Sequence, residues 1–162
     1  MTAKYSIQIG KNNPILRDIS QEVDKIDSSL LDFAKDLISY MYKYDWVWLA
    51  APQIGKNIRV IATTQWNVKD GKENQLSETI MINPVFLKKS QEMSVGEEAC
   101  LSLPDEIGDV KRHKSIHIEY LDLKGNKQKK KLKNFDAVIV QHEMDHLDGI
   151  LFTDKLVNKK KS

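Results

Sequence analysis

The chain has 162 residues and a formal net charge of +2, with 41% hydrophobic and 30% charged residues. This composition is typical of a globular protein, and the sequence contains no run of about 18 apolar residues that would span a membrane. Its one cysteine, Cys100, excludes an internal disulfide and indicates a fold that does not depend on an oxidising compartment.

The sequence shows no internal repeat and no Pro- or Gly-rich linker, so we expect residues 1–162 to form one domain. The first residues lack the apolar segment of a secretory signal peptide, and a cytoplasmic protein is therefore expected. An organelle protein whose transit peptide has been removed stays an alternative. The small net charge argues neither for nor against a nucleic-acid partner.

The first helix is predicted over residues 28–44. The preceding residues 1–26 are mostly polar and indicate a strap around the core. Asp27 and Ser28 are both good N-caps, because their side-chain oxygens accept hydrogen bonds from free N–H groups at a helix start. Apolar residues then recur at helical spacing as far as Met41 and give the helix one apolar stripe.

Two short strands are predicted next, at residues 59–64 and 79–86. Asp70-Gly71 has turn chemistry and indicates a long polar loop between them. Proline cannot donate to a strand ladder, so Pro84 indicates a sheet edge or a strand end.

The last third of the chain predicts a hairpin followed by a helix. Residues 115–122 alternate between apolar and polar side chains, and the turn residues 124–126 (KGN) lead into a second strand at 127–133. A helix is expected over 135–148, with Gly149 as its stop. A helix, several strands and a final helix are typical of the α+β class.

The strongest chemical signal is the H-E-x-x-H pattern at residues 142–146. On a helix, His142 and His146 lie about 40° apart and one turn apart along the axis, so both imidazoles reach one ion. Glu143 lies beside them and is placed to exchange protons with a water on that ion. Two ordinary histidines on a solvated helix are the alternative. The apolar residues 138–140 oppose it, because they make the helix too apolar for a surface element.

A catalytic site of this kind usually has three protein ligands and a water. Many H-E-x-x-H peptidases take a Glu or His downstream, but the residues after His146 include neither. The third ligand must therefore come from upstream, and Cys100 is the candidate. A lone cysteine is otherwise more often a small buried hydrophobe. A thiolate with two imidazoles suits Zn²⁺ or Fe²⁺.

A third segment, residues 49–55 (LAAPQIG), is weak by itself and is also consistent with a small-residue turn after a helix. Gln53 offers a neutral amide donor to a developing oxyanion.

Together these segments resemble three ordered motifs of the peptide deformylase family, G-x-G-L-A-A-x-Q, E-G-C-L-S and Q-H-E-x-D-H. Here they read WVWLAAPQ at 46–53, EACLS at 98–102 and QHEMDH at 141–146. Ala99 replaces one glycine, and Trp46 and Trp48 replace the two glycines of the first motif. Residues 14–17, 82–84 and 147–152 also look like family segments.

The resemblance implies a hydrolase that removes the N-formyl group from the initiator methionine of nascent polypeptides and releases formate. It implies an α+β fold of mainly antiparallel strands around a central metal-binding helix, with the N-terminal helix packed outside. Cys100, His142 and His146 would bind one divalent ion, natively Fe²⁺, with Zn²⁺, Ni²⁺ or Co²⁺ as substitutes.

The resemblance also implies roles around the ion. Glu143 would act as general base and then as acid. Gln53 and the backbone N–H of Leu101 would form the oxyanion hole. Arg112 follows the cysteine motif and is expected to pair with Glu98 beside the metal loop.

Two other functions compete with this interpretation. A zinc endopeptidase shares the H-E-x-x-H pattern but leaves Cys100 and Gln53 unexplained. A weakly active or substrate-altered relative is suggested by Trp46 and Trp48. We expect these tryptophans to have ordinary extended backbone, and Trp48 to lean over the cleft as a wall of the methionine pocket. The alternative is that both pack away on the first helix.

The expected partners are N-formylmethionyl nascent peptides, with no membrane and no specific DNA. The lysines at 159–161 are either a solvated end or a contact with ribosomal RNA, since three charges add affinity without sequence specificity.

Overall fold

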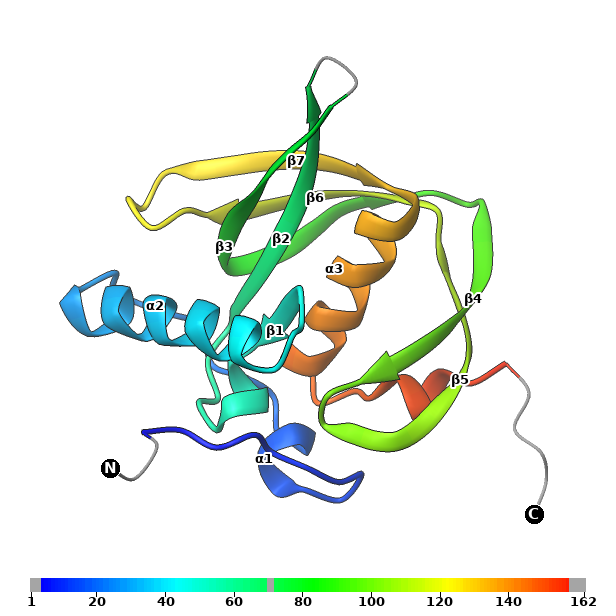
Figure 1. Ribbon diagram of the computed structural model, residues 1–162, viewed down its shortest axis with the longest axis horizontal. Coiled ribbons are helices and arrows are strands. Elements are labelled where there is room, and N and C mark those ends of the chain that lie inside the picture. Colours follow the sequence, from blue (N-terminus) through cyan, green and yellow to red (C-terminus); the bar gives the residue numbers. More distant parts are fainter. Residues whose placement is uncertain (1–3, 70–71, 158–162) are drawn as a thin grey trace.

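The computed structural model describes residues 4–69 and 72–157 (Figure 1). Five antiparallel strands form a sheet in the order β1-β2-β3-β6-β7, and β4 and β5 form a separate two-stranded hairpin. The strands are β1 (Trp48–Ala50), β2 (Val60–Lys69), β3 (Lys72–Lys89), β4 (Met93–Cys100), β5 (Leu103–His113), β6 (Ser115–Leu121) and β7 (Lys127–Lys133). The helices are α1 (Pro14–Arg17), α2 (Ser28–Lys43), η1 (Ala51–Ile54), α3 (Asn134–Leu147) and η2 (Phe152–Lys155). The predicted α+β class with mainly antiparallel strands is confirmed.

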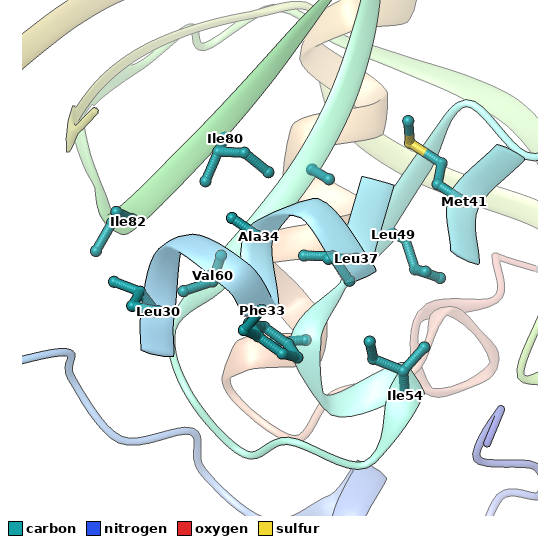
Figure 2. Close-up of a cluster of buried hydrophobic side chains, with 12 residues drawn as sticks. Leu30, Phe33, Ala34, Leu37, Met41, Leu49, Ile54, Val60, Ile80 and Ile82 are labelled. Atoms are coloured by element: carbon teal, nitrogen blue, oxygen red, sulfur yellow. The ribbon is translucent and has the colours of Figure 1, made fainter. Parts of the chain in front are cut away.

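Helix α2 forms as predicted and covers the outside of the sheet. The Asp27 carboxylate accepts a 3.0 Å hydrogen bond from the Leu30 N–H and so caps the first turn. Leu37 and other residues of its apolar stripe pack against β1, η1, β2 and β3 in one buried cluster (Figure 2). Full burial of one such side chain contributes roughly 1.5–3 kcal/mol. The amphipathic stripe is therefore sufficient to hold α2 in place.

Helix α3 lies at the centre of the molecule, between the large sheet and the β4-β5 hairpin (Figure 1). Ala137, Val140 and Met144 pack against Ile116 and Ile118 of β6. The helix ends at Gly149, where φ is 70° and a Cβ would lie 2.5 Å from the Arg17 carbonyl oxygen, so only glycine fits. No helix within the described ranges combines the length and apolar character needed to span a membrane.

The middle of the chain differs from the prediction in two ways. Strands β2 and β3 extend well beyond residues 59–64 and 79–86 into the polar stretch that was expected to be a loop; the turn residues 70–71 lie outside the described ranges. Pro84 is at neither an edge nor a strand end, because β3 lies between β2 and β6.

A bulge explains how β3 accommodates Pro84. The β3–β6 register shifts between Ile82 and Val85, so the missing proline N–H falls where the ladder is already interrupted. Asn83 at the same place has φ of 50°, and its side chain makes two hydrogen bonds with the Val23 backbone, of 2.8 and 2.9 Å. The bulge therefore also fastens the N-terminal strap to the sheet.

Candidate active site

Three potential metal ligands converge from two elements. Helix α3 presents His142 and His146 one turn apart, with ring centroids 5.1 Å apart, and β4 ends at Cys100. The ligand atoms of the three buried residues all lie within 4.8 Å of one another. Cys100 Sγ is 3.4 Å from His146 Nε2, close to the roughly 3.5 Å that separates two ligands of one tetrahedral zinc or iron ion. The three residues singled out from the sequence are thus brought together.

The β4-β5 hairpin places Cys100, although neither strand was predicted. Cys100 pairs with Leu103 across a tight turn at residues 101–102. Burial, and next the Glu143 charge, raise the pKa of the Cys100 thiol to about 12, while hydrogen bonds from Ser102 and Leu103 oppose this. A thiol so placed would lose its proton only when a metal cation takes the place of the proton on the sulfur, and the proton is then released to solvent.

The two imidazoles are held in place by their surroundings as potential metal ligands. Burial lowers the pKa of His146 well below its usual value, with further lowering from the His142 and Arg112 charges. His142 Nδ1 lies 2.8 Å from Glu98 Oε2, so this nitrogen donates to the carboxylate and leaves Nε2 free. Each ring therefore has a nitrogen close enough to Cys100 Sγ for the three residues to share one ion.

The predicted pairing of Arg112 with Glu98 is confirmed, and it belongs to a larger network. Arg112 donates to both Glu98 oxygens at 2.5 and 2.9 Å, and its remaining Nη1 donates to Asp145 at 2.7 Å. Burial opposes ionisation of Glu98, but hydrogen bonds from Arg112 and His142 outweigh it and lower the Glu98 pKa to about 2. Glu98 is therefore a fixed negative charge behind His142.

Glu143 is fully buried and unpaired. Neither carboxyl oxygen has a hydrogen-bond partner among the residues that the structure describes, and Oε1 lies 3.9 Å from His142 Nε2. Burial raises the Glu143 pKa well above its usual value. An unpaired buried carboxyl beside one sulfur and two nitrogen ligand atoms fits a divalent-metal site with room for a water.

Gln53 faces the same site from η1. The Ala50 N–H donates to Gln53 Oε1 at 2.9 Å, which fixes the amide so that Nε2 points toward Cys100 Sγ at 3.5 Å and Ser102 Oγ at 3.3 Å. Leu101 lies in the turn directly after Cys100, with its half-buried side chain against the α2 cluster. A donor amide and the turn backbone thus border the ligand atoms.

A pocket of about 190 Å³ opens beside His142, and Trp46 and Trp48 both line it. Trp48 lies in β1, so the expected extended backbone is confirmed for this residue; Trp46 precedes the strand and does not have positive φ. Trp46 also packs on the α2 cluster. The Trp48 ring instead packs edge-to-face on Phe135, with the two ring centroids 5.7 Å apart. Trp48 borders the pocket as expected, and the alternative in which both rings turn away does not hold.

Four residues of the site were missed from the sequence: Ser102, Phe135, Gln141 and Asp145. Phe135 had a signal, because it precedes His142 by two helical turns and so shares its face. Gln141 lies within the third motif. Its side chain exchanges hydrogen bonds with the His113 backbone at 3.1 and 2.9 Å and ties α3 to the end of β5.

Comparison with known proteins identifies peptide deformylases as similar in both sequence and structure. The family model described as polypeptide deformylase matches residues 7–162. The peptide deformylase of Finegoldia magna is 38% identical over 91% of this chain and 87% of its own length. The crystal structure of peptide deformylase from Thermotoga maritima has a TM-score of 0.85 at 33% identity, covering 96% of this chain and 99% of that one. The Met-Ala-Ser-bound class I type b peptide deformylase from Acinetobacter baumannii has a TM-score of 0.85 at 34% identity, covering 96% and 100%.

Proposed function

The chain belongs to the polypeptide deformylase family, and we propose that it removes the formyl group of nascent polypeptides with the residues gathered around Cys100. The observation that carries this proposal is the convergence of three buried ligand atoms within 4.8 Å of one another beside an unpaired Glu143. An endopeptidase is not favoured, since the related chains and structures are named as peptide deformylases.

One divalent ion would be held by Cys100, His142 and His146, with Fe²⁺ as the native metal and Zn²⁺, Ni²⁺ or Co²⁺ as substitutes. Such an ion, when bound, supplies Lewis acidity and lowers the pKa of a coordinated water toward about 7. Glu98 keeps His142 in the tautomer that offers Nε2, and Arg112 holds Glu98 in place.

The chain's own groups would then move protons and bind charge. Glu143 would accept a proton from the water that attacks the formyl carbon and pass it to the leaving amine. Negative charge grows on the formyl oxygen, where Gln53 Nε2 and the Leu101 N–H would donate hydrogen bonds. The rigid Ala50–Gln53 contact supports this, because a preorganised donor needs no reorientation during reaction.

The substrate would be an N-formylmethionyl peptide. The pocket beside His142 is bordered by apolar residues such as Val138 and Ile139 and suits the methionine side chain. The related Acinetobacter baumannii structure holds a peptide that begins with methionine. The formyl hydrogen is small, so a tight fit at the reacting carbon would reject acetylated peptides.

Three further proposals concern the whole chain. Residues 1–162 would act as one catalytic domain, which the near-complete overlap with single related chains supports. The cytoplasm, where nascent formylated chains are made, is the proposed location. The lysines at 159–161, which lie outside the described residues, are proposed to contact ribosomal RNA.

Anaerobic purification with metal analysis, followed by formate release from formyl-Met-Ala-Ser, tests the function. We expect about one iron per chain and rapid formate release that air or peroxide abolishes. A Cys100→Ala control should lose the metal. Full activity after long aerobic handling without added metal would exclude iron, and cleavage of unformylated peptides would favour an endopeptidase.

A further inference from the structure

Two cavities adjoin along the face of β4 that points to α3. The pocket beside His142 has about 190 Å³, and a second cavity has about 340 Å³. Both are bordered by Glu97, Glu98, Phe135 and Val138. Because four residues are shared, the second cavity continues the first away from the ligand atoms.

Gly96 lies at the start of the second cavity. Side chains alternate along a strand, so Ser94, Gly96 and Glu98 share the face of β4 that borders the second cavity. Glu98 contacts His142, which makes Gly96 the next residue outward on that face. A Cβ added at Gly96 would meet no atom within 4 Å and would therefore point into open space. Gly96 borders the second cavity and not the first, so a side chain at this position would occupy space of the second cavity.

We infer that Gly96 sets the length of the first side chain that the cleft accepts, and that chains longer than methionine extend past it into the second cavity. This inference rests on the proposed function. A methionine side chain has only four heavy atoms, so the first cavity, of about 190 Å³, is large enough to hold it and the second cavity stays free.

The second cavity has apolar walls where an extended chain would pass. Phe135 and Val138 border it from α3, and Val110, which pairs with Gly96, borders it from β5. The ligand class is therefore N-formyl peptides with a long, unbranched, apolar first side chain. A bulky side chain at residue 96 would take up part of the space that such a chain needs in the second cavity.

The test compares two formyl peptides, X-Ala-Ser, in which X is methionine or 2-aminodecanoic acid. The measured quantity is the ratio of kcat/KM for the long chain to that for methionine. Wild type should process both. Gly96→Val should lower the ratio at least about tenfold, since a single misplaced methylene changes discrimination by 10-fold or more. Gly96→Ala should lower it less.

Val95→Ile is the matched control, because Val95 neighbours Gly96 on β4 but is 54% exposed and borders neither cavity. It should leave the ratio unchanged. An unchanged ratio in Gly96→Val, or an equal fall for both peptides, would overturn the inference.

Binding separates this inference from the proposed function. In a Glu143→Gln background, peptide binding can be measured without turnover. The signal is the change in the fluorescence of Trp46 and Trp48, which border the first cavity. Adding Gly96→Val should weaken binding of the long-chain peptide at least about tenfold and leave the methionine peptide within threefold. If wild type releases no formate, the proposed function fails. A selective loss of long-chain peptide binding in Gly96→Val would still support the inference about Gly96, and equal binding of both peptides would refute it.

Discussion

Two regions of the molecule, the α2 side and the β4-β5 hairpin side, are built on different physical principles. On the α2 side, the cluster around Leu37 and Leu49 is made of apolar side chains that need only shape and volume (Figure 2). On the hairpin side, Glu98, Arg112 and His142 are buried polar groups whose hydrogen bonds match one another. The first side is stabilised by area removed from water. The second is stable only while each charge keeps its partner, and so it holds one geometry.

The largest effect is expected from a substitution that removes proton transfer and leaves the packing on both sides unchanged. Glu143→Gln keeps the volume of the side chain but cannot accept a proton, so turnover should fall about 10²–10⁴-fold. Metal content and the far-UV circular dichroism spectrum should match wild type. Formate release at a near wild-type rate would remove Glu143 from the mechanism.

The polar side should break when one partner is lost. Arg112→Met leaves the Glu98 carboxylate buried without its cation, while Asp145 keeps its pairing with Lys155, and should lower the free energy of unfolding by about 3–5 kcal/mol. Lys35→Met is the control, because the Lys35–Asp32 pair is exposed and worth about 0–1 kcal/mol. Urea unfolding of the metal-free proteins measures both, and equal effects would refute the contrast.

The apolar side should lose stability without losing the site. Leu37→Ala should lower the free energy of unfolding by about 2–5 kcal/mol, since Leu37 is fully buried. The metal content of the folded protein should stay unchanged. Ser39→Ala on the exposed face of the same helix should change stability by less than about 0.5 kcal/mol. Loss of metal from folded Leu37→Ala would show that the two sides are coupled.

The oxyanion assignment concerns a single donor between the two sides. Gln53→Ala should lower kcat about 10²–10³-fold with little change in KM, because the hydrogen bond tightens in the transition state. Gln53→Glu has the same shape without the donor and should be equally impaired. An effect confined to KM would assign Gln53 to substrate binding instead.

The smallest expected effect is at the border formed by Trp48. Trp48→Gly removes one wall of the pocket and the contact with Phe135, so kcat/KM for formyl-Met-Ala-Ser should rise severalfold at some cost in stability. Hydroxamate inhibitors with long side chains should also bind more tightly. Lower stability with no gain in either measurement would make the tryptophan structural.

Elements with clear periodicity were predictable from the sequence. Helix α2, helix α3 and the β6-β7 hairpin begin and end within about two residues of the prediction, because alternation, apolar stripes and Gly149 are local signals. The β4-β5 hairpin was not predictable in this way. Its exposed polar faces give no clear alternation. Contacts between distant segments hold it: Leu103 and Val110 pack against Phe152, and Arg112 pairs with Asp145.

The residues of the site also fall into those with a local sequence signal and those placed by contacts between distant segments. His142, Glu143 and His146 follow from helical spacing, and Cys100 from the need for a third ligand. Pairings between distant segments, such as Gln141 with the His113 backbone, have no periodic signal. The prediction of a sheet edge or strand end at Pro84 was wrong for a related reason. The bulge that accommodates Pro84 depends on the register between β3 and β6, which are distant in the sequence.

Gln141 and Glu98 have a kinetic consequence. Gln141 fastens α3 to the end of β5, and Glu98 fastens β4 to His142, so the hairpin and the helix are joined at two points before any ion arrives. The hairpin cannot swing away from the helix while both joints hold. A metal ion would therefore enter a site whose ligands are already in place, and we expect its rate of entry to depend on ligand deprotonation and solvent access.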